Sequence, residues 1–479
     1  MTPFLAIVKL TCRSAVRSNV FRFLLFLLLV CVILVPNTLK GDGTAQGYLQ
    51  VMLEYSTAFA ALILSTSIIW LACSEFCTDL ENGQLHMIVV KPVSRITVWL
   101  GKFTGVFLIH FVLLVIAFAF IYGFLMFQYG RQKFTPEERA RMENEVFAGR
   151  RVFTPYLGDL NKMVNEELAR RIATAKKQGE SLPDMDGTAR RKYMQSIRME
   201  LLAGMGEVGP GKMKTWYYMG LPKEYKDPVY IGYRAYAGNL GSKNQKIGQG
   251  FWFIRYVQRT YDENVLDKDG KPTLKSTREL PLQLPPEQIL TSAYKEFVIP
   301  GDVLISDGTA SIGFANLQSK DSETLHFQVT EGPRLLLKET GFLNNYLRAM
   351  LAIALGIFAL GMIASSFAAF LSMPTAVFLT LSDLVTGLFS SYLISSIEST
   401  GDGVSLMDYL GTLLAQIMMS LLIPVQSFFV SGHLATGTLI EYSYLAQMLV
   451  FNIILKGLPL CLLGIWLYWR RETALAMKQ

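Results

Sequence analysis

The stretch from Ser74 to Lys102 reads SEFCTDLENGQLHMIVVKPVSRITVWLGK, and it separates two long apolar runs at 55–73 and 103–127. Each run is long enough to cross a bilayer as a helix, which takes ~20 mostly apolar residues. Two consecutive spans joined by a short polar segment predict an α-helical polytopic membrane protein.

The rest of the chain contains more runs of this kind. They predict six spans, at 20–37, 55–73, 103–127, 347–371, 375–397 and 445–469. A further run at 409–423 is short for a span, because Pro424 ends it. The predicted number of spans follows from charge. Segments 1–19, 74–102 and 470–479 carry Lys and Arg, whereas 398–444 carries none. Six spans put all three basic segments in the cytoplasm, together with both termini, and leave 406–423 as an outer interfacial or re-entrant helix.

Hydrophobic residues make up 51% of the chain and charged residues 17%, but the charges concentrate in the middle. Residues 128–344 therefore predict a soluble extracytoplasmic α+β insert between membrane halves 1–127 and 345–479. Its first part, to about 205, is helix-prone and starts at Thr135-Pro136. Short alternating segments such as 229–233 follow and predict a β-sandwich.

The stretch that starts at Ser74 also has the pattern of an amphipathic helix. Glu75, Asp79 and Asn82 share one polar stripe at helical spacing. Pro92 ends the helix, because the residue before a proline is disfavoured in the helical region. Ser94 is then the expected N-cap of the span that follows.

This stretch resembles the ABC-2 type permease family, in particular the branch related to multicopper-enzyme maturation permeases. The matching residues are Glu75, Glu81, Gly83, Gln84, Leu85, then Lys91-Pro92-Val93-Ser94-Arg95 and Leu100-Gly101-Lys102. Two further matches are Gly341 through Ala349, and the chain end from Ile423-Pro424 to Arg470-Arg471-Glu472. The large insert departs from the compact core of the family.

The resemblance implies the permease subunit of an ATP-binding cassette exporter in the cytoplasmic membrane. Such a subunit pairs with itself or with a sister permease, and two separate ATP-binding subunits drive it. Residues 74–95 would be the coupling helix on the ATPase, and 1–19 an elbow helix on the inner surface. The residues carried over to ATPase coupling are Glu75, Asp79, Glu81, Asn82, Gly83, Lys91, Pro92 and Arg95.

Three ionisable residues fall inside predicted spans: His110, Asp383 and Lys456. Such residues are costly in lipid and usually face a partner or an aqueous path. We expect Asp383 to interact with Lys456, His110 or both. The alternative is that each makes an isolated structural hydrogen bond or snorkels.

No motif predicts catalysis, a resident cofactor, a metal site or nucleic-acid binding. Residues 206–212, GEVGPGK, have phosphate-loop spacing, but Met213 replaces the hydroxyl that would bind Mg²⁺. ATP is therefore expected on a partner polypeptide, and the chain is expected not to be an enzyme. The competing hypothesis is a membrane-anchored binding or scaffold protein that displays the insert without transport. The sequence does not identify a substrate.

Overall fold

A computed structural model describes residues 2–38, 44–81, 93–132, 134–178, 187–238, 247–266, 272–319, 323–328, 332–390, 413–414 and 422–470. The chain divides into two compact units, Met1–Gly149 with Thr340–Gln479, and Arg150–Glu339. We call them the membrane unit and the soluble unit. The division lies inside the predicted insert, because the residues up to Gly149 pack with the helices of the membrane unit.

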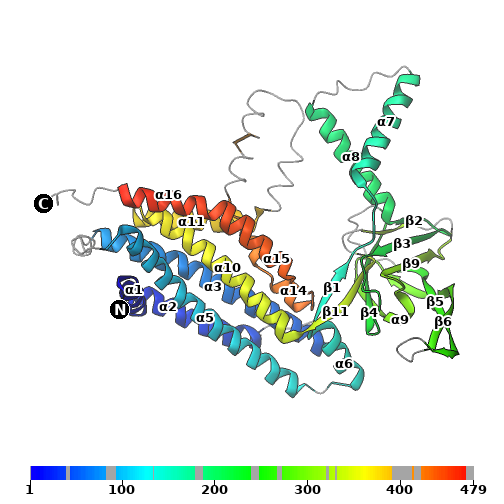
Figure 1. Cartoon of the computed structure of the whole chain (residues 1–479), viewed down its shortest axis with the longest axis horizontal. Coiled ribbons are helices and arrows are strands. Elements are labelled where there is room, and N and C mark those ends of the chain that lie inside the picture. Colours follow the sequence, from blue (N-terminus) through cyan, green and yellow to red (C-terminus); the bar gives the residue numbers. More distant parts are fainter. Residues whose placement is uncertain are drawn as a thin grey trace. The chain divides into compact units, whose positions relative to one another are not determined.

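The membrane unit is helical (Figure 1). Its elements are α1 (Pro3–Arg17), α2 (Asn19–Thr38), α3 (Ala45–Glu81), α5 (Arg95–Arg131), α6 (Pro136–Arg141), the π-helix η1 (Met142–Val146), α10 (Phe342–Ala368), α11 (Met373–Leu388), the 3₁₀ turn η2 (Val425–Phe428), α14 (Ser431–Ala435), α15 (Tyr442–Gln447), the π-helix η3 (Met448–Gly457) and α16 (Leu458–Arg470).

Within the described residues, four helices are long and apolar enough to cross a membrane: Ala45–Thr78, Arg95–Arg131, Phe342–Ala368 and Tyr442–Arg470. The pair Pro3–Arg17 and Asn19–Leu34, bent by 70°, makes a fifth if it counts as one span. The chain is thus a polytopic helical membrane protein. The predicted span at 375–397 corresponds in part to α11, a helix of 16 residues. Residues 391–397 of the predicted span lie outside the described part of the chain. Six spans therefore stay a prediction.

Contacts identify the helix ends that lie together. Of the four long helices, α3, α10 and Tyr442–Arg470 finish at the end of the bundle where α5 begins. At one end, Arg95 at the start of α5 donates to the Trp469 carbonyl of α16, and Cys77 near the end of α3 contacts the Ala368 carbonyl of α10. At the other end, Asn345 at the start of α10 binds the backbone just before α15. We call the first the Arg95 end and the second the Asn345 end.

One prediction about the stretch between the second and third spans is wrong. Residues 74–81 do not begin a separate surface helix but continue α3 without a break as far as Glu81. The reason is that no glycine or proline interrupts the stretch from Ser74 to Glu81. Ser94 is confirmed as the N-cap of α5, because its hydroxyl accepts a hydrogen bond from the Thr97 backbone N–H.

The soluble unit contains two sheets and a helical hairpin. Its elements are β1 (Ala148–Phe153), α7 (Leu160–Gln178), α8 (Gly187–Gly206), β2 (Glu207–Val208), β3 (Met213–Met219), β4 (Pro228–Ala237), β5 (Ile247–Leu266), β6 (Pro272–Gln283), β7 (Glu287–Leu290), β8 (Tyr294–Pro300), α9 (Gly301–Leu304), β9 (Thr309–Asn316), β10 (Leu325–Phe327) and β11 (Arg334–Gly341).

One sheet has the order β1-β11-β4-β10-β2, with β8 paired to β4, and the other has the order β3-β9-β5-β6, with β7 paired to β5. Side chains from both sheets form a single core that includes Tyr233, Trp252, Phe314 and Phe327. This agrees with the predicted β-sandwich. The expected order, helices first and strands afterwards, is wrong in one detail: β1 precedes the helices and pairs with the last strand, β11.

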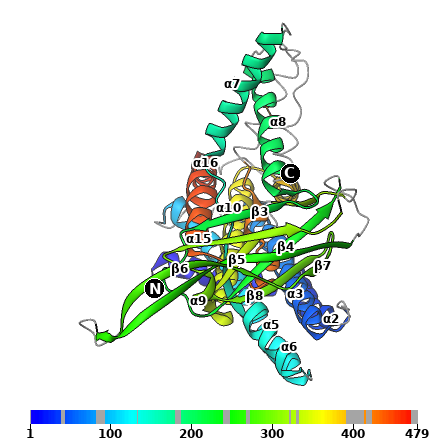
Figure 2. The ribbon, with the colours of Figure 1, turned by 90° about the vertical axis from the view of Figure 1, so that its right-hand side faces the viewer.

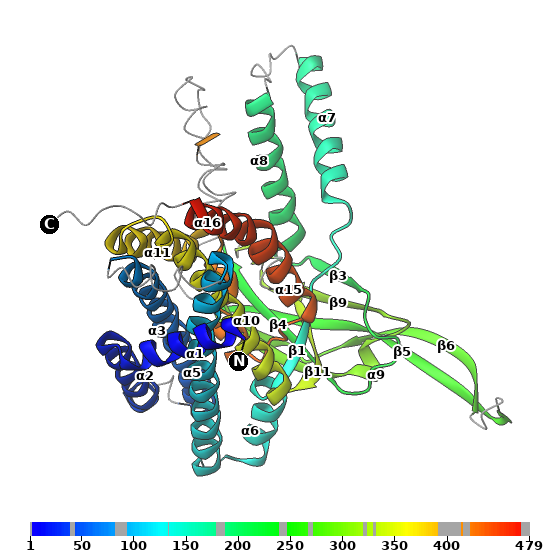
Figure 3. The same ribbon diagram turned by 60° about the vertical axis from the view of Figure 1, so that its left-hand side comes forward.

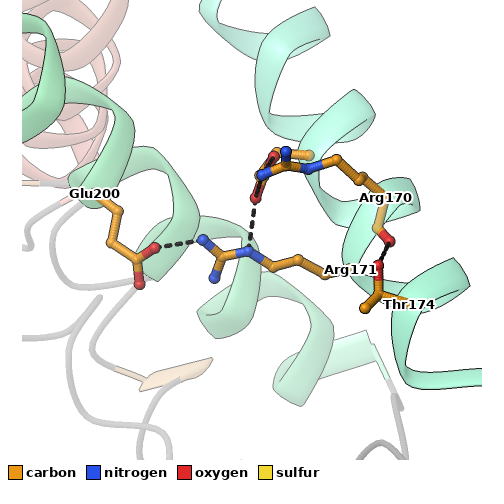
Figure 4. A network of polar contacts seen from close by, with 5 residues as sticks. Arg170, Arg171, Thr174 and Glu200 are labelled. Carbon is orange, nitrogen blue, oxygen red and sulfur yellow. Dashed lines mark hydrogen bonds and ion pairs between the residues drawn. The ribbon is translucent and has the colours of Figure 1, made fainter. Parts of the chain in front are cut away.

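The helices α7 and α8 stand side by side as a pair (Figure 2). Only three of their described side chains, Val164, Leu168 and Ile197, form the buried centre of their contact. An ion network supplements this small core. Arg171 on α7 donates to Glu167 one turn away and to Glu200 on α8 (Figure 4).

Candidate functional site

Four of the predicted coupling residues flank residues 82–92, at the Arg95 end of the membrane unit. Glu75 lies near the end of α3, and Arg95 is the first residue of α5. Asp79 and Glu81 lie in the last turns of α3. Asn82, Gly83, Lys91 and Pro92 lie outside the described residues. The structure therefore describes the two flanks of this site.

A lysine joins the two flanks. Lys102 on α5 is 4% exposed, and its Nζ donates to the Glu75 carbonyl of α3 at 2.6 Å. The ammonium also lies 5.4 Å from the centre of the Phe76 ring. A buried ammonium needs such partners, because removing it from water without them is expensive. The bond fixes the end of α3 to the first turns of α5.

Aromatic packing strengthens the same junction. The buried Trp99 ring lies 5.9 Å from the Phe76 ring on α3 and 5.5 Å from Phe103. Phe76 in turn meets the edge of Tyr468 on α16 at 6.3 Å. A hydrogen bond of 2.8 Å from Arg95 to the Trp469 carbonyl gives α16 a second attachment. Three helices therefore converge where α3 ends and α5 begins.

The helix α1, which the sequence assigns to an elbow, lies against α5 (Figure 3). Two glycines of α5 make this approach possible. A Cβ at Gly101 would be 2.8 Å from the Ile7 side chain, and one at Gly105 would be 2.8 Å from Thr11. The Cys12 thiol contacts the Gly105 carbonyl at 3.5 Å. The same region of α5 thus carries both α1 and the end of α3.

His110 forms a structural contact between two helices. It is fully buried, with Nε2 3.0 Å from the Ser67 hydroxyl of α3 and Nδ1 2.8 Å from the Val106 carbonyl. Both ring nitrogens are engaged, so the expected alternative that His110 pairs with Asp383 is wrong. The isolated structural hydrogen bond, the other alternative, describes His110.

Asp383 on α11 and Lys456 on η3 are close enough to interact electrostatically. Among the described residues they form no direct ion pair, because the Lys456 Nζ donates to the Leu422 carbonyl at 2.8 Å and the buried Asp383 Oδ2 accepts no hydrogen bond. The two charges therefore lie near each other beside a carbonyl of unwound backbone. The expected interaction of Asp383 with Lys456 therefore stays a prediction.

The unwound backbone is the segment 422–430, of which only η2 is a short helical turn. Non-helical backbone at membrane depth requires hydrogen-bond partners from the protein. The last span supplies two of them: the Tyr444 hydroxyl donates to the Ser427 carbonyl at 2.9 Å, and the Lys456 Nζ donates to the Leu422 carbonyl. In addition, Asn452 donates to the Ser427 hydroxyl at 3.1 Å. Asn452 lies in the π-helix η3, and π-helical turns frequently occur at functional sites.

The depth of this segment is fixed by its neighbours. A Cβ at Gly387 of α11 would be 2.6 Å from the Ile423 carbonyl, and one at Gly457 would be 3.6 Å from the Ile423 side chain. Gly457 is near the middle of the span Tyr442–Arg470. Ile423, at the end of the predicted segment 406–423, thus lies deep in the bundle. Of that segment, residues 406–412 and 415–421 are outside the described part of the chain.

No sequence pattern assigns a structural role to Lys102, Asn345 or Asn452. Their partners are far away in sequence, and no local pattern indicates them. Asn345 is 0% exposed; its amide donates to the Thr438 carbonyl, and its oxygen accepts from the Ile440 N–H, both at 2.9 Å. The only available signal was that Asn345 and Lys102 belong to the stretches that carry the family resemblance.

Within the described residues, no group of three or more His, Cys, Asp or Glu side chains could hold a metal ion. Comparison with known families gives one match: residues 32–138 match the model of the ABC-2 family transporter protein. No curated protein and no solved structure matches the chain. The match runs from the end of α2 through α3 and α5 into α6, and so includes both flanks of 82–92. With the helical fold, it supports an ABC-2 type permease.

Proposed function

We propose that this chain is the membrane permease subunit of an ATP-binding cassette exporter, driven by separate ATP-binding subunits. The observation that carries the proposal is the ABC-2 match over 32–138, which coincides with the helices that flank the predicted coupling segment. ATP binds the partner subunits, and a second permease, identical or related, completes the transporter. The transported substrate is not specified by this proposal.

The proposed coupling segment, 74–95, is attached in a way that suits force transmission. Its first residues belong to α3, its last residue starts α5, and Lys102 ties the two helices together. Arg95 adds α16 through the Trp469 carbonyl. A displacement of this segment by an ATPase subunit would therefore act on three helices at once. The acidic residues Glu75, Asp79 and Glu81 would face the ATPase.

We assign the Arg95 end to the cytoplasm. Basic residues lie beside it in sequence, including Arg95, Lys102 and Arg470, and the positive-inside rule places such segments in the cytoplasm. Because α5 leaves this end and α10 returns to it, the residues between them are extracytoplasmic.

The orientation is tested by labelling single cysteines in a cysteine-free background. A cysteine at Ser242 should react with an impermeant maleimide in intact cells, whereas a cysteine at Ser94 should react only after the membrane is permeabilised. Labelling at Ser94 and protection at Ser242 would invert the topology.

The function is tested by charge reversal in the coupling segment. Glu81→Arg should weaken binding of the ATP-binding subunit, or abolish the stimulation of ATP hydrolysis by the permease, without unfolding it. Glu137→Arg, on the exposed face of α6, is the matched control and should leave both unchanged. Equal coupling in both variants would contradict the assignment. If no ATP-binding subunit co-purifies with the wild-type protein, the anchored scaffold becomes the better hypothesis.

A further inference from the structure

The outer face of the sheet β3-β9-β5-β6, opposite the sandwich core, is hollowed along β9. Ala310, Ile312 and Phe314 of β9 point into the core, so Thr309, Ser311 and Gly313 point outward. These outward residues are small. The neighbouring strands, β3 and β5, carry larger outward residues, including Tyr217 and Phe253. The centre of the face is therefore lower than its two sides.

One part of this hollow is a cavity of about 240 Å³. We call it the Tyr217 pocket, and its lining includes Tyr217, Met219, Arg255, Asp307, Thr309 and Ser311. Phe253 covers Gly313 farther along β9, because a Cβ at Gly313 would be 2.0 Å from the Phe253 ring. The volume is below the ~300–1,000 Å³ typical of drug-sized ligands, so a single ring is a suitable size of ligand.

The rim of the pocket is held in one conformation. Asp307 and Gly308 have φ values of 48° and 76°, as in the tight type I′ turn of a β-hairpin. The backbone of Ser306 and Thr309 is paired on either side of them, and the Leu221 N–H donates to the Gly308 carbonyl at 3.0 Å. Glycine is required at 308 for this conformation. The Asp307 carboxylate is thus presented from a fixed turn.

The lining of the pocket includes an aromatic ring, two side chains of opposite charge and two hydroxyl groups. Tyr217 is 50% exposed and offers a ring face, and the Arg255 guanidinium lies 5.8 Å from its centre. Arginine only donates hydrogen bonds, an ionised aspartate only accepts them, and the hydroxyls of Thr309 and Ser311 can do both. The pocket therefore combines an aromatic wall with donors and acceptors at its edge.

We propose that the Tyr217 pocket binds a neutral saccharide ring. A sugar offers C–H groups for the Tyr217 face and hydroxyls that both donate and accept hydrogen bonds around its edge. A phosphate would be repelled by Asp307, and an ammonium group by Arg255. A hydrocarbon would remove both charged groups from water without replacing their hydrogen bonds. The proposal is independent of transport, since it concerns binding by the soluble unit.

The test uses the full-length protein in lipid nanodiscs, because common glycoside detergents carry a sugar. Saturation-transfer NMR would be recorded with glucose, galactose and N-acetylglucosamine as separate probes, with inorganic phosphate and ethanolamine in parallel binding titrations. At least one monosaccharide should bind, with the transfer strongest on its ring C–H groups. Phosphate and ethanolamine should neither bind the pocket nor displace the sugar.

Variants then locate the site. Tyr217→Ala should weaken sugar binding by about tenfold, the effect of ~1.4 kcal/mol, whereas Tyr217→Phe should retain it. Arg255→Gln should also weaken it. Met219 and Met213 lie on one face of β3 and are 56% and 69% exposed, but only Met219 lies in the pocket. Met219→Ala should therefore change sugar binding, and its matched control Met213→Ala should not. Absence of binding by every monosaccharide, equal binding in Tyr217→Ala and wild type, or tighter binding of phosphate would each overturn the proposal.

Discussion

Replacing Lys102 by methionine removes the ammonium group but keeps a side chain of similar length. The Lys102 Nζ donates to the Glu75 carbonyl at 2.6 Å in a buried environment, and a hydrogen bond to a charged group contributes about 1.5–3 kcal/mol. The contact with Phe76 adds to this, although such terms are not additive. We expect Lys102→Met to cost about 2–3 kcal/mol of local stability at the Arg95 end, because the Glu75 carbonyl also loses a donor.

Hydrogen exchange in nanodiscs measures this local cost directly. A loss of about 2–3 kcal/mol should speed exchange roughly 30- to 150-fold at amides near Glu75 and in the first turns of α5, if they exchange by local opening. Exchange in the middle of α10 should not change. Lys9→Met is the control, because Lys9 is an exposed lysine of α1. Unchanged exchange in Lys102→Met would refute the conclusion that this bond holds α3 to α5.

Three other predictions test the remaining parts of the structure. Asp383→Asn should impair transport, and adding Lys456→Gln to this variant should partly restore transport if the two charges interact. A double variant whose defect is the simple sum of the two single defects would show that the two residues are independent. Asn345→Leu should destabilise the membrane unit by about 2–4 kcal/mol because it leaves two backbone groups of 438–440 without partners, whereas the neighbouring Asn344→Leu should cost less than about 1 kcal/mol in thermal or denaturant unfolding. Hydrogen bonds from Arg170 and Arg171 lower the pKa of Glu167, and Arg171 lowers the pKa of Glu200. The two glutamates therefore stabilise the α7–α8 hairpin above the ordinary glutamate pKa near 4.5, and this stabilisation disappears as the pH falls through the lowered pKa values. Hydrogen exchange in α7 and α8 should rise in that acidic range, and it should rise less in Arg171→Gln.

The sequence predicts the parts of this fold that depend on local pattern. Apolar runs mark the long helices, and Ser94 and Thr135 mark two helix starts; the second is confirmed by a complete capping box with Glu138. Alternation predicts β5 because that strand has one buried face, whereas Val229–Tyr233 of β4 is buried on both faces. Several such alternating segments in succession predict the two sheets.

The rest depends on contacts between distant residues. The bond from Lys102 to Glu75 joins positions 27 apart, and Asn345 binds backbone more than 90 residues away. The π-helix η3 has no sequence signature of its own. Its polar side chains at Asn452 and Lys456 bind groups of 422–430, which is unwound beside them. Hydropathy does not predict the extension of α3 to Glu81, because the polar residues from Ser74 onward have the pattern of the end of a span.

Site-specific cross-linking from the coupling segment tests the central claim most directly. A photoreactive amino acid would be placed at position 95, and separately at position 137 on α6, in the full-length protein in its native membrane. We predict that position 95 cross-links an ATP-binding subunit, that nucleotide changes the yield, and that position 137 does not cross-link it. Cross-linking of the ATP-binding subunit at position 137 and not at 95, or at neither position in a membrane that contains the subunit, would contradict the proposed coupling site.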